Sequence, residues 1–408
     1  MKKISLEQAV QIASEYYQSK RYKQVTQILQ TLIQHGVQNN DIYLLMGNAH
    51  YCLGQYQQAV QAYLDGIHTN TSSANLYANL GNAYIRQGYY ESAIDSYNNA
   101  IAIEPDYIAV HHNLMYAYSM THQTENAIQK CDEILSFIGC QPNNLDIALE
   151  SQYDRQNPSP AYLSLIDIYN KLHVNGDSEN KIDSQKMYVG ESILPWIGTI
   201  KRFIILTNSH TLLDYGSGKG FQYKNLLLED KDQSKYRGLQ DYWEVDEIYC
   251  YDPAYLPHQK LPQKQYDVVI STDVLEHCHQ EDIKWIINEI FSLAGKFVFV
   301  NIACYQAGKS LPNGENAHCI IRPADWWDKL LQLVVPSYPK VKYCILLEYI
   351  WVDIERERRM FDIRSNFAST EIELDPSAIT ILEADENLVP YVPYKIPAGA
   401  SLQPTLRV

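Results

Sequence analysis

The sequence lacks several features that would place it in common protein classes. No apolar run approaches the about 18 residues that a membrane-spanning helix requires, and Met1-Lys-Lys is not followed by the apolar segment of a secretory signal. The eight cysteines show no C-x-x-C spacing, so they predict neither a zinc site nor a disulfide framework. We therefore expect a cytoplasmic protein with reduced cysteines and no membrane association.

Basic charge is also scarce. The chain has 33 Lys and Arg against 48 Asp and Glu, a net charge of −15, and its basic residues form no stripe. A protein that tracks nucleic acid needs a positive surface along the phosphate path, so we expect no nucleic-acid partner. At about 100–200 residues per domain, the 408 residues are enough for two or three domains.

Residues 211–220 read Thr-Leu-Leu-Asp-Tyr-Gly-Ser-Gly-Lys-Gly. The apolar start predicts a buried parallel strand, and the glycines predict a tight turn that leaves room for a ligand to approach the backbone. Such a turn usually leads into a helix whose free N–H groups bind polar or negative groups. The dinucleotide pattern G-x-G-x-x-G fails, because Phe221 occupies its third glycine position. A purely structural glycine turn remains an alternative.

Three further segments fit the same sheet. Residues 247–252 form a short strand that ends in Asp252, whose carboxylate can accept hydrogen bonds from two ribose hydroxyls. The alternative is a strand-terminating Asp-Pro turn. Residues 266–277 predict a strand that runs into a helix, and 296–301 predict the next parallel strand. Helical spacing of apolar residues fills 281–294 between them.

Two of these segments carry a family resemblance. The D-x-G-x-G-x-G spacing of 214–220 resembles motif I of class I S-adenosyl-L-methionine (SAM)-dependent methyltransferases, and 266–277 resembles their motif IV. The resemblance covers roughly 155–360 and implies a doubly wound, Rossmann-like α/β domain that binds SAM. The cofactor-binding residues that it implies are Asp214, Tyr215, Gly216, Ser217, Gly218, Gly220, Asp252, Asp273 and Val274. A nicotinamide or flavin enzyme remains the alternative.

The sequence departs from that family in two places. The segment between Gly220 and Asp252 is longer than the about 20 residues expected from glycine loop to ribose acid, so we expect 229–240 to form a surface loop or an extra helical turn. Residues 253–265 are too few for a helix and a third strand. We therefore expect a shortened third-strand region and assign no adenine-binding acid.

Two residues are candidates for catalysis. The resemblance places Asp273 beside the methionine end of SAM. His318 follows a polar, turn-rich segment, and similar methyltransferases carry a histidine here that can act as a base. The alternative is a histidine that bonds backbone and fixes the loop. His277 is interpreted as a structural helix cap, and the pair Trp326 and Trp327 as pocket wall or core.

The first third of the chain repeats every 34 residues: Gly47 recurs as Gly81 and Tyr63 as Tyr97. This period and its small and aromatic positions match the tetratricopeptide (TPR) pattern. We expect four helix pairs that form an α-solenoid. Asn48, Asn79, Asn82 and Asn113 recur at equivalent places, and they resemble the asparagine ladder in the repeats of O-linked N-acetylglucosamine transferases. Such amides can bind an extended protein or peptide partner, or they simply lie on a solvated helix face.

These observations predict an α-solenoid followed by an α/β domain. We assign 6–139 to TPR repeats, 140–160 to a linker, 161–364 to the methyltransferase domain and 365–408 to an extended tail with an edge strand through Ile372–Leu374. The expected function is SAM-dependent methyl transfer, with repeats that recruit a protein substrate or partner. The alternative is a non-catalytic TPR scaffold with a methyltransferase-like fold.

Overall fold

The computed structural model describes residues 6–37, 39–69, 72–137, 145–178, 181–224, 226–372, 374, 379–384 and 405–407. The chain divides into two compact units. The helical unit comprises Met1–Gln141 together with Ile350–Arg359, and the sheet unit comprises Pro142–Tyr349 and Met360–Val408. The sequence did not predict that a short segment from the second half would belong to the helical unit.

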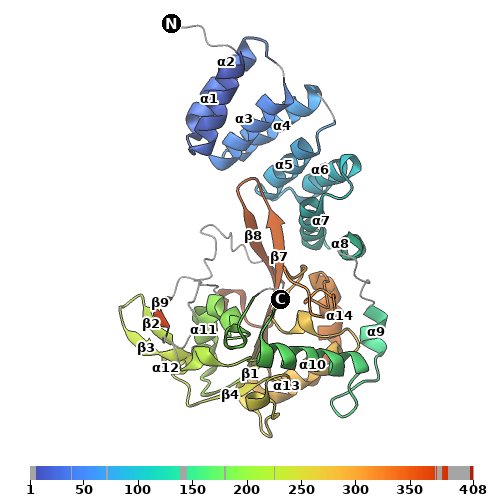
Figure 1. The fold of residues 1–408 in the computed structure, drawn as a ribbon, viewed down its shortest axis with the longest axis vertical. Coiled ribbons are helices and arrows are strands. Elements are labelled where there is room, and N and C mark those ends of the chain that lie inside the picture. Colours follow the sequence, from blue (N-terminus) through green and yellow to red (C-terminus); the bar gives the residue numbers. More distant parts are fainter. Residues whose placement is uncertain are drawn as a thin grey trace. The chain divides into compact units, whose positions relative to one another are not determined.

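The helical unit is a succession of short antiparallel helix pairs (Figure 1). In the described residues these are α1 (Leu6–Gln18), α2 (Tyr22–Gln34), α3 (Asn40–Cys52), α4 (Tyr56–Thr69), α5 (Ala74–Ile85), α6 (Tyr90–Ile103), α7 (Ile108–Met120) and α8 (Thr124–Phe137). This confirms the predicted TPR solenoid of four pairs. The last predicted repeat residues, 138 and 139, lie outside the described part.

The repeated glycines let the two helices of a pair cross closely. A Cβ atom on Gly47 would lie 2.2 Å from the ring of Tyr63, and one on Gly81 would lie 2.4 Å from the ring of Tyr97. Both tyrosines are fully buried. Since no side chain fits at either glycine, the 34-residue glycine spacing reflects helix packing rather than backbone flexibility.

The sheet unit contains a seven-stranded sheet in its described residues, in the order β10-β8-β7-β6-β5-β1-β4. The strands are β1 (Thr211–Tyr215), β4 (Glu247–Tyr251), β5 (Tyr266–Thr272), β6 (Ala294–Ala303), β7 (Lys342–Val352), β8 (Glu357–Ser365) and β10 (Thr405–Arg407). From β4 to β7 all neighbouring strands are parallel. Strand β4 is the edge strand, so the predicted absence of a third strand beyond it holds among the described residues.

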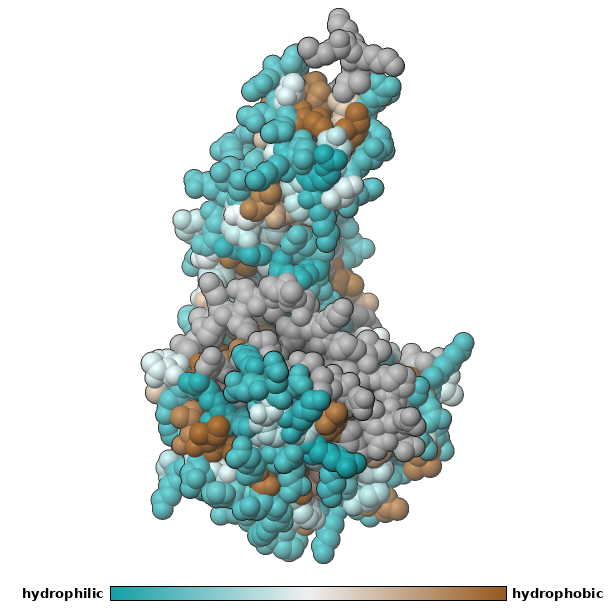
Figure 2. All heavy atoms as spheres, turned by 90° about the vertical axis from the view of Figure 1, so that its left-hand side faces the viewer, coloured by the Kyte–Doolittle hydropathy of each residue, from teal (hydrophilic) through white to brown (hydrophobic). Residues whose placement is uncertain are grey.

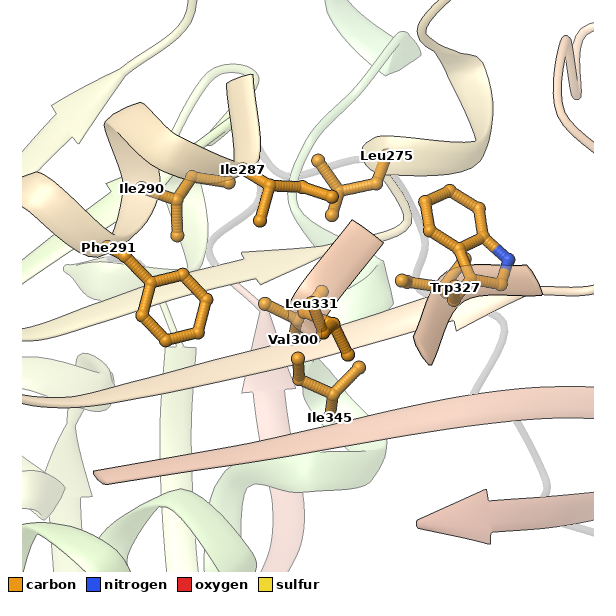
Figure 3. A pocket seen from close by; sticks show the side chains of 9 residues that line it. Leu275, Ile287, Ile290, Phe291, Val300, Trp327, Leu331 and Ile345 are labelled. Carbon is orange, nitrogen blue, oxygen red and sulfur yellow. The ribbon is translucent and has the colours of Figure 1, made fainter. Parts of the chain in front are cut away.

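Helices cover both faces of this sheet. Helix α11 (Ile197–Thr207) packs on one face, against residues such as Phe297 and Phe299 of β6. Helices α13 (Ile283–Leu293) and α14 (Ala324–Val334) cover the other face, where an apolar pocket is lined by Leu275, Ile287, Ile290, Phe291, Val300, Ile302, Trp327, Leu331 and Ile345 (Figure 3). Trp326 and Trp327 are both buried, so both tryptophans belong to the core.

The remaining helices of the sheet unit are α9 (Leu145–Glu150), α10 (Pro160–Asn175) and α12 (Gly238–Trp243). Single or double 3-10 turns occupy Ser184–Lys186, Glu191–Trp196, Phe221–Tyr223, Leu256–His258, Leu275–His277, Val335–Ser337 and Ser369–Glu371. Helix α9 lies inside the predicted linker 140–160, whose first residues, 140–144, are outside the described part.

Three local predictions are corrected by the structure. The glycine loop leads only into the short 3-10 turn Phe221–Tyr223 and not into a long helix. The stretch 229–240 contains the start of α12, the extra helical turn that was expected, but it also contributes to β2 (Leu226–Asp230) and forms β3 (Lys235–Arg237). The described strands of the tail are β9 (Ile379–Ala384), which pairs with β2, and β10, which is an edge strand of the seven-stranded sheet beside β8; Ile372 and Leu374 lie in neither. Tail residues 373, 375–378, 385–404 and 408 lie outside the described part.

The described residues contain no helix long and apolar enough to cross a membrane. On the face drawn in Figure 2, hydrophilic residues predominate and hydrophobic residues form separate small patches. The cysteines in the described ranges all have free thiols, as their scattered spacing predicted.

Candidate functional site

The sheet reverses its direction of growth between β1 and β5. From β1 the chain proceeds outward to β4, and it then returns to place β5 on the other side of β1. In open α/β sheets, ligands bind beyond the carboxyl ends of the strands at such a switch point. The glycine loop after β1 and the segment after β5 both lie there, so the sheet brings the two predicted motifs together.

The N–H groups of the glycine loop all have hydrogen-bond acceptors within the chain. The N–H groups of Gly216 and Ser217 donate to the carbonyl oxygen of Tyr251, at 2.8 and 3.1 Å. Lys219 donates to the carbonyl of Tyr188 at 2.8 Å, and Gly220 to that of Ser217 at 3.2 Å. The loop is therefore ordered by its own neighbours, and these N–H groups already have acceptors.

Each glycine of the motif is required by a close neighbour and by a positive φ angle. A Cβ on Gly216 would lie 2.3 Å from Cγ2 of Val274, which joins the two motifs. A Cβ on Gly218, whose φ is +54°, would lie 2.2 Å from the backbone oxygen of Tyr188. The sequence did not predict that Tyr188, just before the 3-10 turn Glu191–Trp196, lies over the loop.

Asp252 lies at the end of β4 beside the glycine loop. Its Oδ2 accepts a hydrogen bond from the N–H of Gly218 at 3.0 Å, and its Oδ1 accepts from the N–H of Ala254 at 2.9 Å. Nε2 of His173 lies 3.9 Å from Oδ2, and burial lowers the pKa of that histidine. The carboxylate of Asp252 thus stabilises the predicted turn, and it is also the group that was predicted to bind ribose hydroxyls.

Asp214 and Tyr215 point into the protein rather than into a cleft. The hydroxyl of Tyr223 donates to Asp214 at 2.6 Å. Burial raises the pKa of Asp214 to about 7, against the opposing hydrogen bond from Tyr223. Tyr215 donates its hydroxyl to Glu289 of α13 at 2.7 Å. The side chains of Asp214 and Tyr215 therefore position the loop and β1 from within the protein. Only the backbone of Tyr215 lies at the carboxyl end of the strand.

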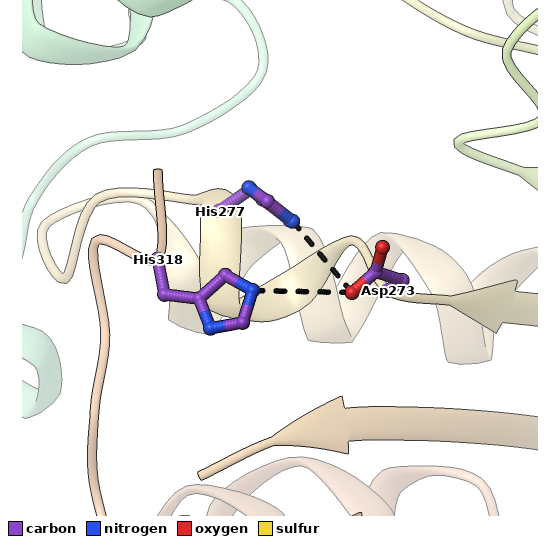
Figure 4. A group of neighbouring side chains, drawn as sticks. All are labelled: Asp273, His277 and His318. Atoms are coloured by element: carbon purple, nitrogen blue, oxygen red, sulfur yellow. Dashed lines mark ion pairs between the residues drawn. The ribbon is translucent and has the colours of Figure 1, made fainter. Parts of the chain in front are cut away.

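Asp273 and His277, after β5, form a cluster with His318, which lies between β6 and α14. Nε2 of His277 lies 3.8 Å from Oδ1 of Asp273, and Nε2 of His318 lies 4.0 Å from the same oxygen. Both rings point toward Asp273 (Figure 4). The three ligand-type atoms all lie within 4.8 Å of one another. These separations are longer than hydrogen bonds, and they suit a bridging cation.

Backbone carbonyls hold both imidazoles by the same ring nitrogen, Nδ1, although the two rings are perpendicular. Nδ1 of His277 lies 2.7 Å from the oxygen of Ala317 and 2.8 Å from the hydroxyl of Tyr169, and Nδ1 of His318 lies 2.5 Å from the oxygen of Tyr305. A carbonyl oxygen only accepts, so Nδ1 carries the proton and Nε2 carries the lone pair when either ring is neutral. His277 has a structural role, as predicted, because its Nδ1 bonds a loop carbonyl, but it does not cap the following helix α13, and its Nε2 faces Asp273.

The charged groups of this cluster shift one another's pKa. Partial burial would raise the pKa of Asp273, but the charges of His277 and His318, when these rings are protonated, hold it well below its usual range. Asp273 adopts a left-handed backbone, with φ of +59°, which is uncommon for a residue other than glycine. Burial, and then the charge of Asp273, raise the pKa of the neighbouring Glu276 well above its usual value.

Sequence reasoning missed Glu276 and His277 as site residues. Their signal was an acid, a second acid and an imidazole at Asp273, Glu276 and His277, directly after a buried strand. These residues become a candidate set of metal ligands only when a second imidazole is known to lie beside them. His318 comes from a distant loop, so the sequence alone could not supply that neighbour.

In the helical unit, the predicted asparagines form two equivalent networks. Asn48 Oδ1 accepts hydrogen bonds from Tyr63 at 2.8 Å and from Asn79 at 3.0 Å. Thirty-four residues later, Asn82 Oδ1 accepts from Tyr97 at 2.7 Å and from Asn113 at 3.0 Å. Asn82 and Asn113 are buried. The alternative of a solvated helix face was therefore wrong for these two residues.

The second network binds the segment Ile350–Arg359, which belongs to the same unit. Asn113 donates to the carbonyl of Val352 and accepts from its N–H, both at 2.8 Å. Trp351 is buried and its indole N–H donates to Tyr97 at 3.3 Å. Tyr51 donates to Asp353 at 3.1 Å. A side-chain amide thus holds one backbone residue through both of its polar groups.

Comparison with known proteins identifies the repeats. The family model described as TPR repeat matches residues 47–88 and 81–121. Among solved structures, MamA is 22% identical over 32% of this chain and 71% of its own, with a TM-score of 0.31. YrrB, described as a TPR protein with an unusual peptide-binding site, is 16% identical over 31% of this chain and 66% of its own, with a TM-score of 0.30.

A tetratricopeptide repeat protein from Parabacteroides merdae is 17% identical over 32% of this chain and 52% of its own, with a TM-score of 0.31. No curated protein matches the chain. The helical unit therefore contains TPR repeats, a class of module that mediates protein–protein interaction, and the sheet unit lies outside the matched residues.

Proposed function

We propose that the sheet unit is a SAM-dependent methyltransferase and that the TPR repeats recruit its protein substrate or an accessory protein. The single observation that carries this proposal is the meeting of the two motifs at the switch point, where Gly216 lies against Val274 and Gly218 bonds Asp252. In doubly wound sheets this is the place where a nucleoside-containing ligand binds.

The strand order is compatible with that assignment. In the doubly wound order 3-2-1-4-5-6, β4, β1, β5, β6 and β7 correspond to strands 2, 1, 4, 5 and 6. Strand 3 has no counterpart in the described part of the chain, so an adenine ring would have to be recognised by residues between β4 and β5. The turn Leu256–His258 occupies that connection.

The residues present fit the cofactor in part. Asp252 offers carboxylate oxygens for ribose hydroxyls, and the left-handed glycines let a ligand approach the backbone. The backbone oxygen of Tyr188 lies over Gly218, however. We infer that cofactor binding displaces the segment around Tyr188, and that Asp252 then exchanges its bond to Gly218 for one to a ribose hydroxyl.

In the proposed reaction, the protein aligns the acceptor and removes its proton. SAM would supply a methyl group that is bound to a sulfonium sulfur. After transfer, the sulfur would leave as a neutral thioether. His318 presents Nε2 toward Asp273 and can take the acceptor's proton, because the carbonyl of Tyr305 fixes its tautomer. The acceptor oxygen or nitrogen would form the new bond to the methyl group as the sulfur–methyl bond breaks, and S-adenosylhomocysteine would leave.

A titration of the full chain with S-adenosylhomocysteine tests this proposal. We expect micromolar binding that Asp252→Asn weakens at least tenfold. The control Asp246→Asn changes an exposed acid before the same strand and should leave the affinity unchanged. Hydrogen exchange around Tyr188 should increase on binding. A lack of binding up to millimolar ligand would contradict the proposal.

A second candidate function is a non-catalytic TPR scaffold. The observation that favours it is the glycine loop, whose N–H groups from Gly216 to Gly220 all have acceptors within the chain. The titration separates the two candidates. If neither S-adenosylhomocysteine nor NADH stabilises the protein against heat, the sheet unit acts as a structural module and the repeats carry the function.

A further inference from the structure

We infer that Asp273, His277 and His318 form a binding site for one divalent transition-metal ion at the carboxyl end of β5. The inference rests on the convergence of the three side chains from two separate segments, one directly after β5 and one between β6 and α14 (Figure 4). Two imidazoles and one carboxylate are ligands typical of zinc, iron and manganese sites.

The distances allow one ion to bridge the three groups. Around an ion with ligand bonds of about 2.1 Å, neighbouring ligand atoms lie roughly 3.0–3.7 Å apart. The two carboxylate–imidazole separations are 3.8 and 4.0 Å, and all three ligand atoms lie within 4.8 Å of one another. Binding of one ion would therefore require the side chains to rotate inward, and the side chain of Asp273 is half exposed.

The groups behind the ligands have the arrangement that metal sites use. Metal-binding histidines almost always donate their other ring N–H to a carbonyl or carboxylate, which fixes the ring and its tautomer. Here Ala317 and Tyr305 supply those carbonyls to His277 and His318. Both Nε2 atoms are thereby directed to the same carboxylate oxygen, as ligands and not as donors when the rings are neutral.

Glu276 supplies a second, independent observation. Its side chain is fully buried, its Oε1 accepts from the N–H of Ala303 at 2.7 Å, and none of the described residues hydrogen-bonds its Oε2. A buried carboxylate oxygen without a partner is costly. Glu276 directly precedes His277 in the chain, so a buried carboxyl oxygen without a hydrogen-bond partner among the described residues lies next to a proposed ligand.

The ion also indicates the class of methyl acceptor, and this step rests on the proposed function. A hydroxyl group bound to a divalent cation loses its proton near neutral pH. The acceptor would therefore be a hydroxyl compound whose oxygen binds the ion. Its proton would pass to solvent, and the oxygen would form the bond to the methyl group as the sulfur–methyl bond breaks. The ion would then replace His318 as the group that favours deprotonation.

Metal titration of the chelator-treated full chain, without SAM, tests the site. With Zn²⁺ or Mn²⁺ at pH 7.5 we expect one strongly bound ion per chain and a higher melting temperature. The double variant His277→Gln/His318→Gln should lose that binding. His210→Gln is the matched control, because His210 Nδ1 also lies 3.8 Å from a carboxylate, that of Asp246, but that pair is not part of the three-residue cluster.

Asp273→Asn guards against a variant that fails to fold, because asparagine tolerates the left-handed backbone at this position. Asp273→Asn should weaken the affinity for the ion at least tenfold. Equal binding by the wild-type chain and the double variant, or no stoichiometric binding by the wild-type chain, would overturn the inference. If the wild-type chain binds the metal ion but not S-adenosylhomocysteine, only the proposed methyl transfer is refuted. If it binds S-adenosylhomocysteine but no metal ion, only the metal site is refuted.

Discussion

The asparagine networks of the helical unit and the glycine loop of the sheet unit use backbone hydrogen bonds in opposite ways. Asn113 holds Val352 through a side-chain amide that pairs with the N–H and carbonyl of one residue. Nearly any residue offers those two groups, so a different strand could take the same place. The glycine loop instead offers its own N–H groups to fixed acceptors of the chain.

The difference lies in what would have to move for a ligand to bind. At the asparagine network, a bound peptide would replace the backbone of Val352 and would offer Asn113 the same two backbone groups. At the glycine loop, a ligand must displace a backbone carbonyl that lies where a Cβ of Gly218 would be. The asparagine network could therefore accept different backbones without rearranging. The glycine loop would have to change conformation before a ligand could bind.

The largest expected effect comes from Gly218→Ala. The alanine would combine a left-handed φ of +54° with a Cβ 2.2 Å from the oxygen of Tyr188. We expect a loss of about 5 kcal/mol in the free energy of unfolding, of which the backbone conformation accounts for about 1–2 kcal/mol. Urea unfolding followed by tryptophan fluorescence measures it.

Gly314→Ala is the matched control for that substitution. Gly314 has a φ of +87°, but no atom lies within 4 Å of its Cβ position. It should lose only the conformational part, about 1–2 kcal/mol. Similar losses in the two variants would mean that Tyr188 does not lie over the loop, and the loop would then be as adaptable as the asparagine network.

A smaller effect is expected from Asp214→Asn, and it depends on pH. The pKa of Asp214 rises from an ordinary 3.8 to about 7 in the folded protein. The folded state therefore binds the proton more tightly, and this contribution to stability is complete below pH 4 and lost as pH rises to 7. Asparagine is neutral throughout, so the variant should gain on the order of 3 kcal/mol over the wild type at pH 8.

Urea unfolding at pH 4.5, 6 and 8 measures that difference. Asp246→Asn, which changes an exposed carboxyl, should show no such trend. If Asp214→Asn differed from the wild type equally at pH 4.5 and 8, Asp214 would be ionised in the folded protein over this range. Burial of the first acid of the motif would then not set its protonation.

The sequence predicted those parts of the fold that depend on local periodicity. The 34-residue spacing of Gly47 and Gly81 reports helix pairs, and the apolar run that ends at Asp214 reports a buried parallel strand. The helix expected after the glycine loop was wrong because Gly220 ends the loop in a left-handed conformation and only one turn follows. Residues 226–230 then pair with the distant tail as a strand.

The candidate site was predictable only as single residues. The sequence placed Asp273 and His318 near the switch point, but nothing local connects His277 with His318, because their contact depends on how the loop after β6 returns. The same holds for Tyr188 over Gly218 and for Ile350–Arg359 on the asparagine network. Long-range pairings of this kind leave no period in a single sequence.

The smallest expected effect is that of Asn113→Ala. The variant leaves both the N–H and the carbonyl of Val352 without their side-chain partner, at a cost of about 2 kcal/mol. Protection of the Val352 amide against hydrogen exchange should fall roughly 30-fold, which is the same free energy expressed as an equilibrium constant.

Asn79→Ala is the control, because Asn79 occupies the equivalent place one repeat earlier and donates to Asn48. It should lose about 1 kcal/mol and leave the Val352 amide protected. Unchanged protection in Asn113→Ala would show that other contacts, such as those of the buried Trp351 and of Asp353, hold the segment. The hydrogen bonds of Asn113 would then not hold the segment. The proposed contrast, in which the asparagine network can accept another backbone and the glycine loop cannot, would fail.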